Sequence, residues 1–424
     1  MFASFLCLCK AVGVCDGVGG GQHGRMGVVL VAKDGRVGRV SCNFLLIKLV
    51  YDFSVLNVYE ISFEQLHSQA LLNYPPKMKF VALLIPFAIL LSMVKGQLVP
   101  AMFIFGDSIV DVGNNNDLVT LVKANFPPYG RDFAHHEPTG RFCNGKLAID
   151  IIAEGLGFTD HQPAYMSDKA NGEMLLIGVN FASAASGYYN ATAILYNTFS
   201  LSQQLENYKD YKNKLTAITG KSNTSSIISN GIHLISSGSS DFLQNYYINP
   251  LLFTSYTPNM FSDILIESYD NFIQNLYELG ARRIGVTTLP PLGCLPAAIT
   301  AFGHGSNQCV ARLNNNAISF NNKLNHRSQR LKRRFSKLKL VVLDIYSPLY
   351  TIITKPDENG FAEVRRACCG TGLLETSILC NQHSIGTCSN ASQYVFWDSF
   401  HPTEAANKIL ATNLSNSGSS LIQP

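Results

Sequence analysis

Five short apolar runs constrain the fold of this chain more than any other feature of its sequence. They are rich in β-branched residues, and helical patterns lie between them: 101–106, 175–182, 231–238, 282–290 and 338–346. Strands of this kind, alternating with helices, are typical of a parallel sheet that is covered on both faces. We therefore expect one α/β domain over residues 98–415, a three-layer α/β/α sandwich with a central, mostly parallel five-stranded sheet.

The two clearest helical patterns cover residues 262–279 and 309–337. In the first, Ser262 can cap the N-terminus and Gly280 can end the helix. The second leads into the basic run 326–340, which we interpret as a solvated helix face. Because only 15% of the residues are charged and the formal net charge is +4, the composition argues against a nucleic-acid-binding protein.

Residues 78–96 have the layout of a secretory signal peptide. Two lysines precede an apolar segment over 80–94, and the small residue Gly96 follows it. The segment is shorter than the roughly 20 apolar residues of a transmembrane helix, so we do not expect a stable membrane anchor. Residues 1–77 show no sustained period, and we interpret them as an N-terminal extension that is disordered or an artefact of the gene model.

Cysteines and glycosylation sequons indicate an oxidising compartment. Six cysteines lie among loops between residues 294 and 388, which favours disulfides over a zinc site because neither a Cys-x-x-Cys pair nor a suitably spaced second histidine is present. Cys294–Cys309 is the one pair that we single out, and Cys143 leaves an odd count after residue 97, so we expect one free thiol. The sequons begin at Asn190, Asn223, Asn390 and Asn413.

Polar, small residues follow three of the expected strands: "GDSIVDVGNNN" (106–116), "NFASAASG" (180–187) and "SSGSSDF" (236–242). Ligands bind at this edge of open parallel sheets. Near the C-terminus, Asp398 and His401 lie three residues apart. Each piece alone could be a simple turn. A serine becomes a nucleophile when a base removes its proton, and an acid must hold that base in the right tautomer. Together the pieces therefore predict a catalytic set of Ser108, His401 and Asp398.

The chain resembles the plant GDSL esterase/lipase family of the SGNH hydrolase superfamily from residue 101 to about 410. The resemblance rests on seven motifs in the family's order: "FGDSIVDVGNNN", "FPPYGRDF" with "TGRFCNGK", "GVNFASAASGY", "SSGSSDFLQNYYINP", "LPPLGCLPA", "ACCGTG" and "YVFWDSFHPTEAAN". The Gly-x-Ser-x-Gly signature is absent from the sequence, which disfavours a nucleophile-elbow hydrolase. The resemblance implies the flavodoxin-like SGNH fold and no metal or organic cofactor.

The resemblance also assigns roles. Ser108 corresponds to the nucleophile, His401 to the general base and later acid, and Asp398 to the residue that orients His401. The oxyanion hole would combine the backbone N–H groups of Ser108 and Ala185 with the side chain of Ser240. Ala185 and Ser240 stand where the family usually has glycine and asparagine, so this part of the site departs from the family pattern.

Asp111 and Asn114 follow the nucleophile closely, and we expect them to support it without taking part in the reaction.

Taken together, these features of the sequence lead us to expect a monomeric, secreted serine esterase or lipase of the cell wall or apoplast. The resemblance implies lipid, cutin-like or acetylated polysaccharide esters as substrates, with an acyl-enzyme on Ser108. The same residues would also permit acyl transfer to an alcohol. A rival interpretation, supported by Ala185 and Ser240, is a catalytically weakened lipid- or carbohydrate-binding wall protein.

Overall fold

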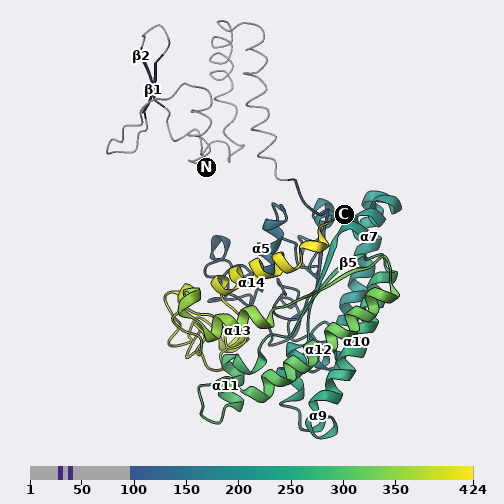
Figure 1. Ribbon diagram of the computed structural model, residues 1–424, viewed down its shortest axis with the longest axis vertical. Helices are drawn as coiled ribbons and strands as arrows, with labels where there is room; N and C mark the ends of the chain where they lie inside the picture. The colour runs from purple at the N-terminus through teal and green to yellow at the C-terminus, as the bar shows by residue number, and fades with distance from the viewer. Residues whose placement is uncertain (1–26, 32–36, 42–95, 424) are drawn as a thin grey trace. The chain divides into compact units, whose positions relative to one another are not determined.

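The computed structural model describes residues 27–31, 37–41 and 96–423 (Figure 1). In the N-terminal unit, β1 (Gly27–Val31) and β2 (Val37–Ser41) pair as antiparallel strands. The predicted signal peptide lies outside the described residues apart from Gly96, and the interpretation of the first 77 residues stays a prediction. The second compact unit, Gly96–Pro424, contains the α/β fold.

Four parallel strands form the sheet of this unit in the order β3-β4-β5-β6. They are β3 (Met102–Gly106), β4 (Ile232–Ser236), β5 (Arg283–Thr287) and β6 (Lys339–Leu343). Successive side chains of a strand point to opposite faces. Phe103 and Phe105 accordingly belong to one core cluster, and Met102 and Ile104 to another. Four of the five predicted strands are confirmed.

The fifth predicted strand, at 175–182, is wrong as a regular strand. A 3₁₀ helix covers Gly172–Ile177, and Gly178 follows it with φ +87°, a conformation that favours glycine and interrupts an extended chain. Only the end of the segment runs beside β3, where the Phe181 N–H donates to the Ile104 carbonyl at 2.7 Å. The sheet therefore has four strands and one irregular segment along its β3 edge.

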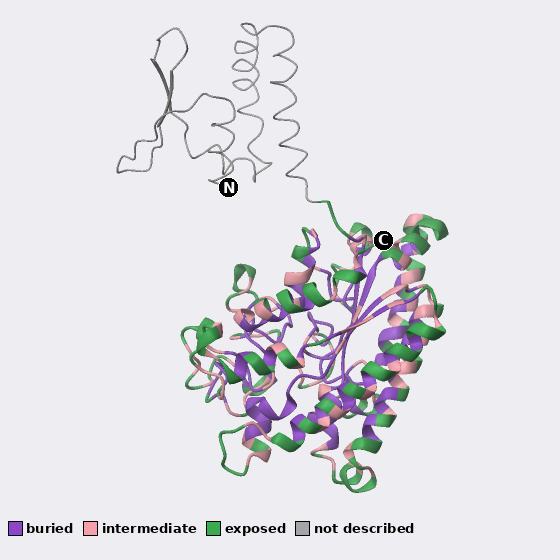
Figure 2. Cartoon of the chain, in the orientation of Figure 1, coloured by how far each residue is buried: buried purple, intermediate pink, exposed green. Residues whose placement is uncertain are grey.

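Helices cover both faces of the sheet (Figure 1). One layer contains α7 (Leu201–Asn230), α10 (Pro258–Glu278) and α12 (Ala311–Arg334), and the other contains α5 (Ala148–Gly155), α13 (Tyr346–Thr354) and α14 (Glu404–Ser417). The shorter helices are α6 (Asn190–Tyr196), α8 (Ser239–Asp241), α9 (Pro250–Ser255) and α11 (Pro296–Phe302). Figure 2 shows buried residues along the strands between the layers. The α/β/α sandwich is confirmed.

The start of α10 differs from the prediction. Thr257 caps the helix, because its Oγ1 accepts a hydrogen bond from the Met260 N–H, and Pro258 occupies the first helical position. Ser262 lies inside the helix and donates to the Pro258 carbonyl at 2.8 Å, so its assignment as the N-cap is wrong. Gly280 follows the helix with φ +114°, in agreement with the predicted stop.

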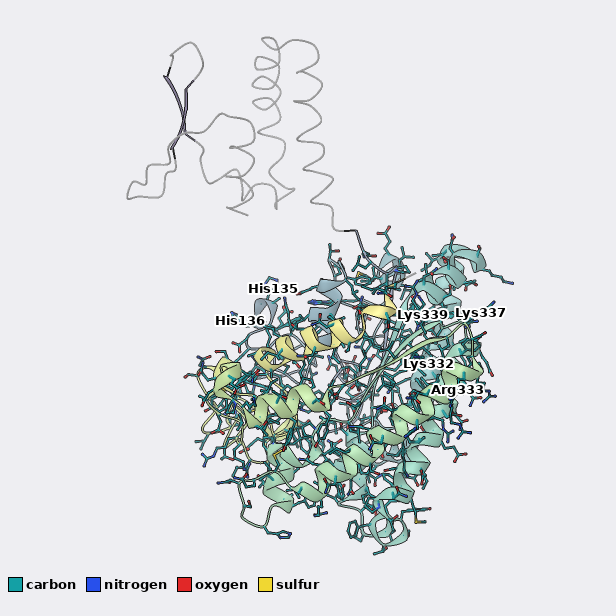
Figure 3. All side chains as sticks on the ribbon, viewed as in Figure 1. His135, His136, Lys332, Arg333, Lys337 and Lys339 are labelled. Carbon is teal, nitrogen blue, oxygen red and sulfur yellow. A yellow bond between two sulfur atoms is a disulfide. The ribbon has the colours of Figure 1, made fainter. Side chains whose placement is uncertain are left out.

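The basic run lies at the exposed C-terminal end of α12. Lys332, Arg333 and Lys337 are exposed there (Figure 3). The helix C-terminus carries partial negative charge, which the three basic residues in its last turn complement. The interpretation of a solvated helix face is therefore confirmed.

All six cysteines between 294 and 388 form disulfides. Cys294 pairs with Cys309 as predicted, Cys368 with Cys388, and Cys369 with Cys380. Cys143 is free and buried, and burial raises the pKa of its thiol. The asparagines of the four sequons are exposed. None of the helices in the described part of the chain is both long enough and apolar enough to cross a membrane.

Gly106, at the end of β3, is required by the close approach of β4. Its φ is +139°, and a Cβ there would lie 1.8 Å from the Ser236 carbonyl oxygen. We expect Gly106→Ala to lower the free energy of unfolding by on the order of 3 kcal/mol, because strain and overpacking add. Gly155, the last residue of α5, is the matched control, since nothing lies within 4 Å of its Cβ position.

Gly155→Ala should raise the free energy of unfolding by roughly 0.5–1 kcal/mol through higher helix propensity. Urea unfolding of both variants beside the parent chain measures the two effects. Equal changes in the two variants would contradict the assignment of Gly106 to a close strand contact.

Candidate active site

Three side chains from distant parts of the sequence meet at the carboxyl edge of the sheet. Ser108 follows the end of β3, and Asp398 and His401 lie on the loop before α14. The His401 Nε2 lies 2.7 Å from the Ser108 Oγ, and the His401 Nδ1 lies 2.6 Å from the Asp398 Oδ1. The structure thus brings together all three residues of the predicted catalytic set.

The carboxylate of Asp398 is fully buried and surrounded by donors. Its Oδ1 also accepts the backbone N–H groups of Phe400 and His401, each at 2.9 Å. Its Oδ2 accepts the hydroxyls of Tyr129 at 2.7 Å and Thr376 at 3.0 Å. These donors satisfy the charged form and fix the orientation of the carboxylate.

Tyr129 is a site residue that the sequence analysis missed. Besides donating to Asp398, its oxygen accepts the Ser377 N–H at 2.7 Å. Burial, with the nearby Asp398 charge, raises the pKa of Tyr129 well above its ordinary value, so the phenol keeps its proton and remains a donor. Tyr129 stands in the "FPPYGRDF" motif, but nothing in that motif points to Asp398 as its partner.

The ring of His401 is held in a position to take a proton from Ser108. It packs on Phe142 with ring centres 4.9 Å apart and is almost fully buried. Because Asp398 offers only acceptor atoms, Nδ1 carries the proton and the Nε2 lone pair faces the Ser108 hydroxyl. The arrangement can activate a serine nucleophile by general-base catalysis.

Ser240 lies in α8 and lines the same small pocket as Ser108 and His401. The pocket encloses about 20 Å³. Within residues 96–423, the Ser240 hydroxyl and the Ser108 backbone N–H have no hydrogen-bond partner. Both groups are therefore available to an oxyanion that forms at Ser108.

Ala185 is fully buried and is not among the residues that line this pocket. Its φ of +62° lies in the left-handed region, which costs a residue with a Cβ about 1–2 kcal/mol and favours glycine. Its backbone N–H donates to no residue of the described domain. The backbone at this position is therefore the one expected for the family's glycine.

Asp111 and Asn114 tie the nucleophile segment to the loop that carries Ala185. The Asp111 Oδ2 accepts the Ala184 N–H at 2.9 Å. The Asn114 side chain donates to the carbonyls of Asn180 at 2.9 Å and Ala182 at 2.7 Å. Burial raises the pKa of Asp111 to about 6. Neither side chain bonds to Ser108, Asp398 or His401, so the geometry suits a supporting position.

A second acid beside the nucleophile, Asp107, was also missed. Its Oδ1 accepts the Ile109 N–H at 3.2 Å, whereas its Oδ2 has no hydrogen-bond partner in the described residues. Burial raises the pKa of this carboxyl from its usual value of 3.8 to about 7.

No group of three or more His, Cys, Asp and Glu side chains that could hold a metal occurs in the part of the chain that the structure describes.

The raised pKa of Asp107 predicts a pH-dependent contribution to stability. Between pH 4 and 7 the folded state holds a proton that the unfolded chain releases, so this contribution falls as the pH rises through that range. Asp107→Asn removes the titration. We expect the variant to gain stability relative to the parent between pH 4 and 8. The gain should be on the order of 4 kcal/mol, the free-energy equivalent of a pKa that moves from 3.8 to about 7.

Urea unfolding at pH 4, 6 and 8 measures this gain. Asp117→Asn serves as the control because Asp117 is exposed. If the Asp107→Asn variant differs from the parent by the same amount at every pH, the buried protonated carboxyl is refuted.

The chain is similar to members of a known protein family. A model of the GDSL-like lipase/acylhydrolase family matches residues 102–414. GDSL esterase/lipase At5g22810 from Arabidopsis thaliana is 68% identical over 338 residues, which cover 79% of this chain and 93% of the relative. GDSL esterase/lipase At5g03810, from the same plant, is 63% identical over 326 residues, which cover 77% of this chain and 92% of the relative.

Solved structures are more distant. An α/β hydrolase enzyme from the metagenome of Lake Arreo, Spain, aligns with a TM-score of 0.38 at 9% sequence identity. The alignment covers 77% of this chain and 99% of that chain. A likeness at this level carries no argument about the site.

Proposed function

Because the chain belongs to the GDSL-like lipase/acylhydrolase family and is similar to plant GDSL esterase/lipases, we propose that it hydrolyses carboxylic esters through an acyl-enzyme on Ser108. The observation that carries the proposal is the continuous set of short contacts from Ser108 through His401 to Asp398. The relatives' names support ester hydrolysis, and the contacts allow His401 to take the proton of Ser108.

In the first half of the proposed reaction, the Ser108 Oγ attacks the ester carbonyl while His401 Nε2 takes its proton. The tetrahedral intermediate collapses, and His401 returns the proton to the leaving alcohol. In the second half, His401 takes a proton from water, which attacks the acyl-enzyme. The bond between the acyl group and Ser108 Oγ breaks, His401 returns the proton to that oxygen, and the acid is released. Asp398 keeps Nδ1 protonated and stabilises the imidazolium in both halves.

The Ser108 N–H, the Ala185 N–H and the Ser240 hydroxyl are proposed to stabilise the oxyanion. Their lack of partners in the described domain supports this role, because preorganised donors need not break other bonds as charge develops. Serine reaches less far than the asparagine that is usual at the Ser240 position. The third donor is therefore proposed to be the weakest part of the site.

Hydrolysis of p-nitrophenyl acetate and butyrate tests the proposed function. We expect the parent protein to release p-nitrophenol and Ser108→Ala to lose at least about a thousandfold in kcat, because the nucleophile is gone. The melting temperature of the variant should stay close to that of the parent. Equal rates for parent and variant would reject catalysis at Ser108 and favour a binding protein.

The role of Ser240 has its own test. We expect Ser240→Ala to lower kcat by on the order of 100-fold with little change in KM, since an oxyanion donor acts mainly in the transition state. Ser240→Asn should match or exceed the parent. Ser239→Ala, a neighbour in α8, should lower kcat far less. If Ser240→Ala and Ser239→Ala have equal effects, Ser240 is not an oxyanion donor.

Secretion is a separate part of the proposal. The three disulfides favour an oxidising compartment, and the exposed sequon asparagines are accessible to glycosylation. We propose a monomeric extracellular glycoprotein that acts in the cell wall or apoplast, with residues 78–96 as its signal peptide. Mass spectrometry of the protein from its native tissue checks this, because peptides from 78–96 in the mature protein would contradict it.

A further inference from the structure

A second cavity lies between the sheet and the layer of α5, α13 and α14. It encloses about 60 Å³, and none of its lining residues is charged. Its walls include Leu234 of β4, Leu343 of β6, Ala148 and Ile152 of α5, and Leu414 of α14. Leu234 and Ile152 are only partly buried although they lie between a sheet and its helices. The layer therefore leaves apolar surface that a ligand can cover.

The few polar groups in the walls are already engaged. The Thr287 hydroxyl donates to the Ser236 Oγ at 3.0 Å, and the Asn407 side chain donates to the Lys146 carbonyl at 3.1 Å. A polar ligand would find few partners in this cavity and would lose its own hydration. The chemistry of the walls thus favours a hydrocarbon group.

This cavity adjoins the pocket of the nucleophile. Ile109, Pro290, Leu295 and Phe400 line both spaces. Ile109 is the residue after Ser108, and Phe400 precedes His401. The cavity and the pocket of the nucleophile are therefore neighbours, separated by four apolar side chains.

We propose that the cavity binds the acyl chain of the ester. One water-sized group needs about 10–15 Å³, so the cavity holds about four to six methylene-sized groups. An acyl group stays attached to Ser108 while the alcohol leaves and water enters, so an apolar space beneath the helices suits it better than the departing alcohol. The inference deepens the proposed function, on which it rests. It names hexanoyl to octanoyl esters as the preferred class, because four to six of their carbons follow the carbonyl and the first methylene, which stay beside Ser108.

Cavity-filling variants test the proposal. Ile152→Phe and Ala148→Leu add bulk inside the cavity. Ile151→Phe is the matched control, because Ile151 lies beside Ile152 in α5, is also partly buried and does not line the cavity. The measurement is kcat/KM for p-nitrophenyl acetate, butyrate, hexanoate, octanoate and palmitate, with thermal melting to verify folding.

For the parent, kcat/KM should rise from acetate to a maximum at hexanoate or octanoate and fall at palmitate. The octanoate-to-acetate ratio should drop at least about tenfold in Ile152→Phe and Ala148→Leu, since each lost methylene contact is worth about tenfold or more. The Ile151→Phe variant should keep the octanoate-to-acetate ratio of the parent. A parent that prefers acetate would overturn the proposal and favour acetylated substrates. Unchanged ratios in both cavity variants would overturn the assignment of the acyl chain to this cavity.

A binding measurement separates this inference from the proposed function. Octanoate should bind to Ser108→Ala, as detected by calorimetry, and binding should weaken at least about tenfold when Ile152→Phe is added. Absence of binding to Ser108→Ala overturns the acyl cavity even if esters are hydrolysed. Cavity-dependent binding by a parent protein that hydrolyses no ester would support the cavity and reject the proposed function.

Discussion

The burial of one carboxylate organises the active-site end of this domain. Asp398 is fully buried, and an ionised carboxylate in that position is costly unless donors surround it. Two donors come from its own turn, one from Tyr129 and one from Thr376. Segments far apart in the sequence must therefore reach Asp398 before the imidazole of His401 can be held toward Ser108.

The disulfide-rich loop supplies part of this shell. Thr376 lies between Cys369 and Cys380, which are bonded to each other. The same loop pairs with the segment before Asp398, because the Cys369 N–H donates to the Trp397 carbonyl at 2.8 Å. Cross-links of this kind reduce the conformational freedom of the unfolded chain. Oxidation of these cysteines and the geometry of Asp398 are thus connected through one loop.

The sequence predicts the parts of the fold that depend on local pattern. Apolar runs locate four strands, whereas 175–182 fails because Gly178 turns the chain where the pattern alone shows a strand. The helix begins at Thr257 and Pro258 and not at Ser262, although each of these residue types is common at a helix start. Tyr129 could not be paired with Asp398, because 269 residues separate them and only the folded sheet edge brings them together. The cavity beside α5 arises from packing, which has no sequence signature.

The activation of Ser108 by Asp398 and His401 can be measured as the rate at which diisopropyl fluorophosphate modifies the protein. Peptide mass spectrometry identifies the modified residue. We predict one adduct on Ser108 and a rate that falls by on the order of 10⁴ in Asp398→Asn, because the wrong imidazole tautomer would face the serine. An adduct on another residue, or an undiminished rate in Asp398→Asn, would contradict the account.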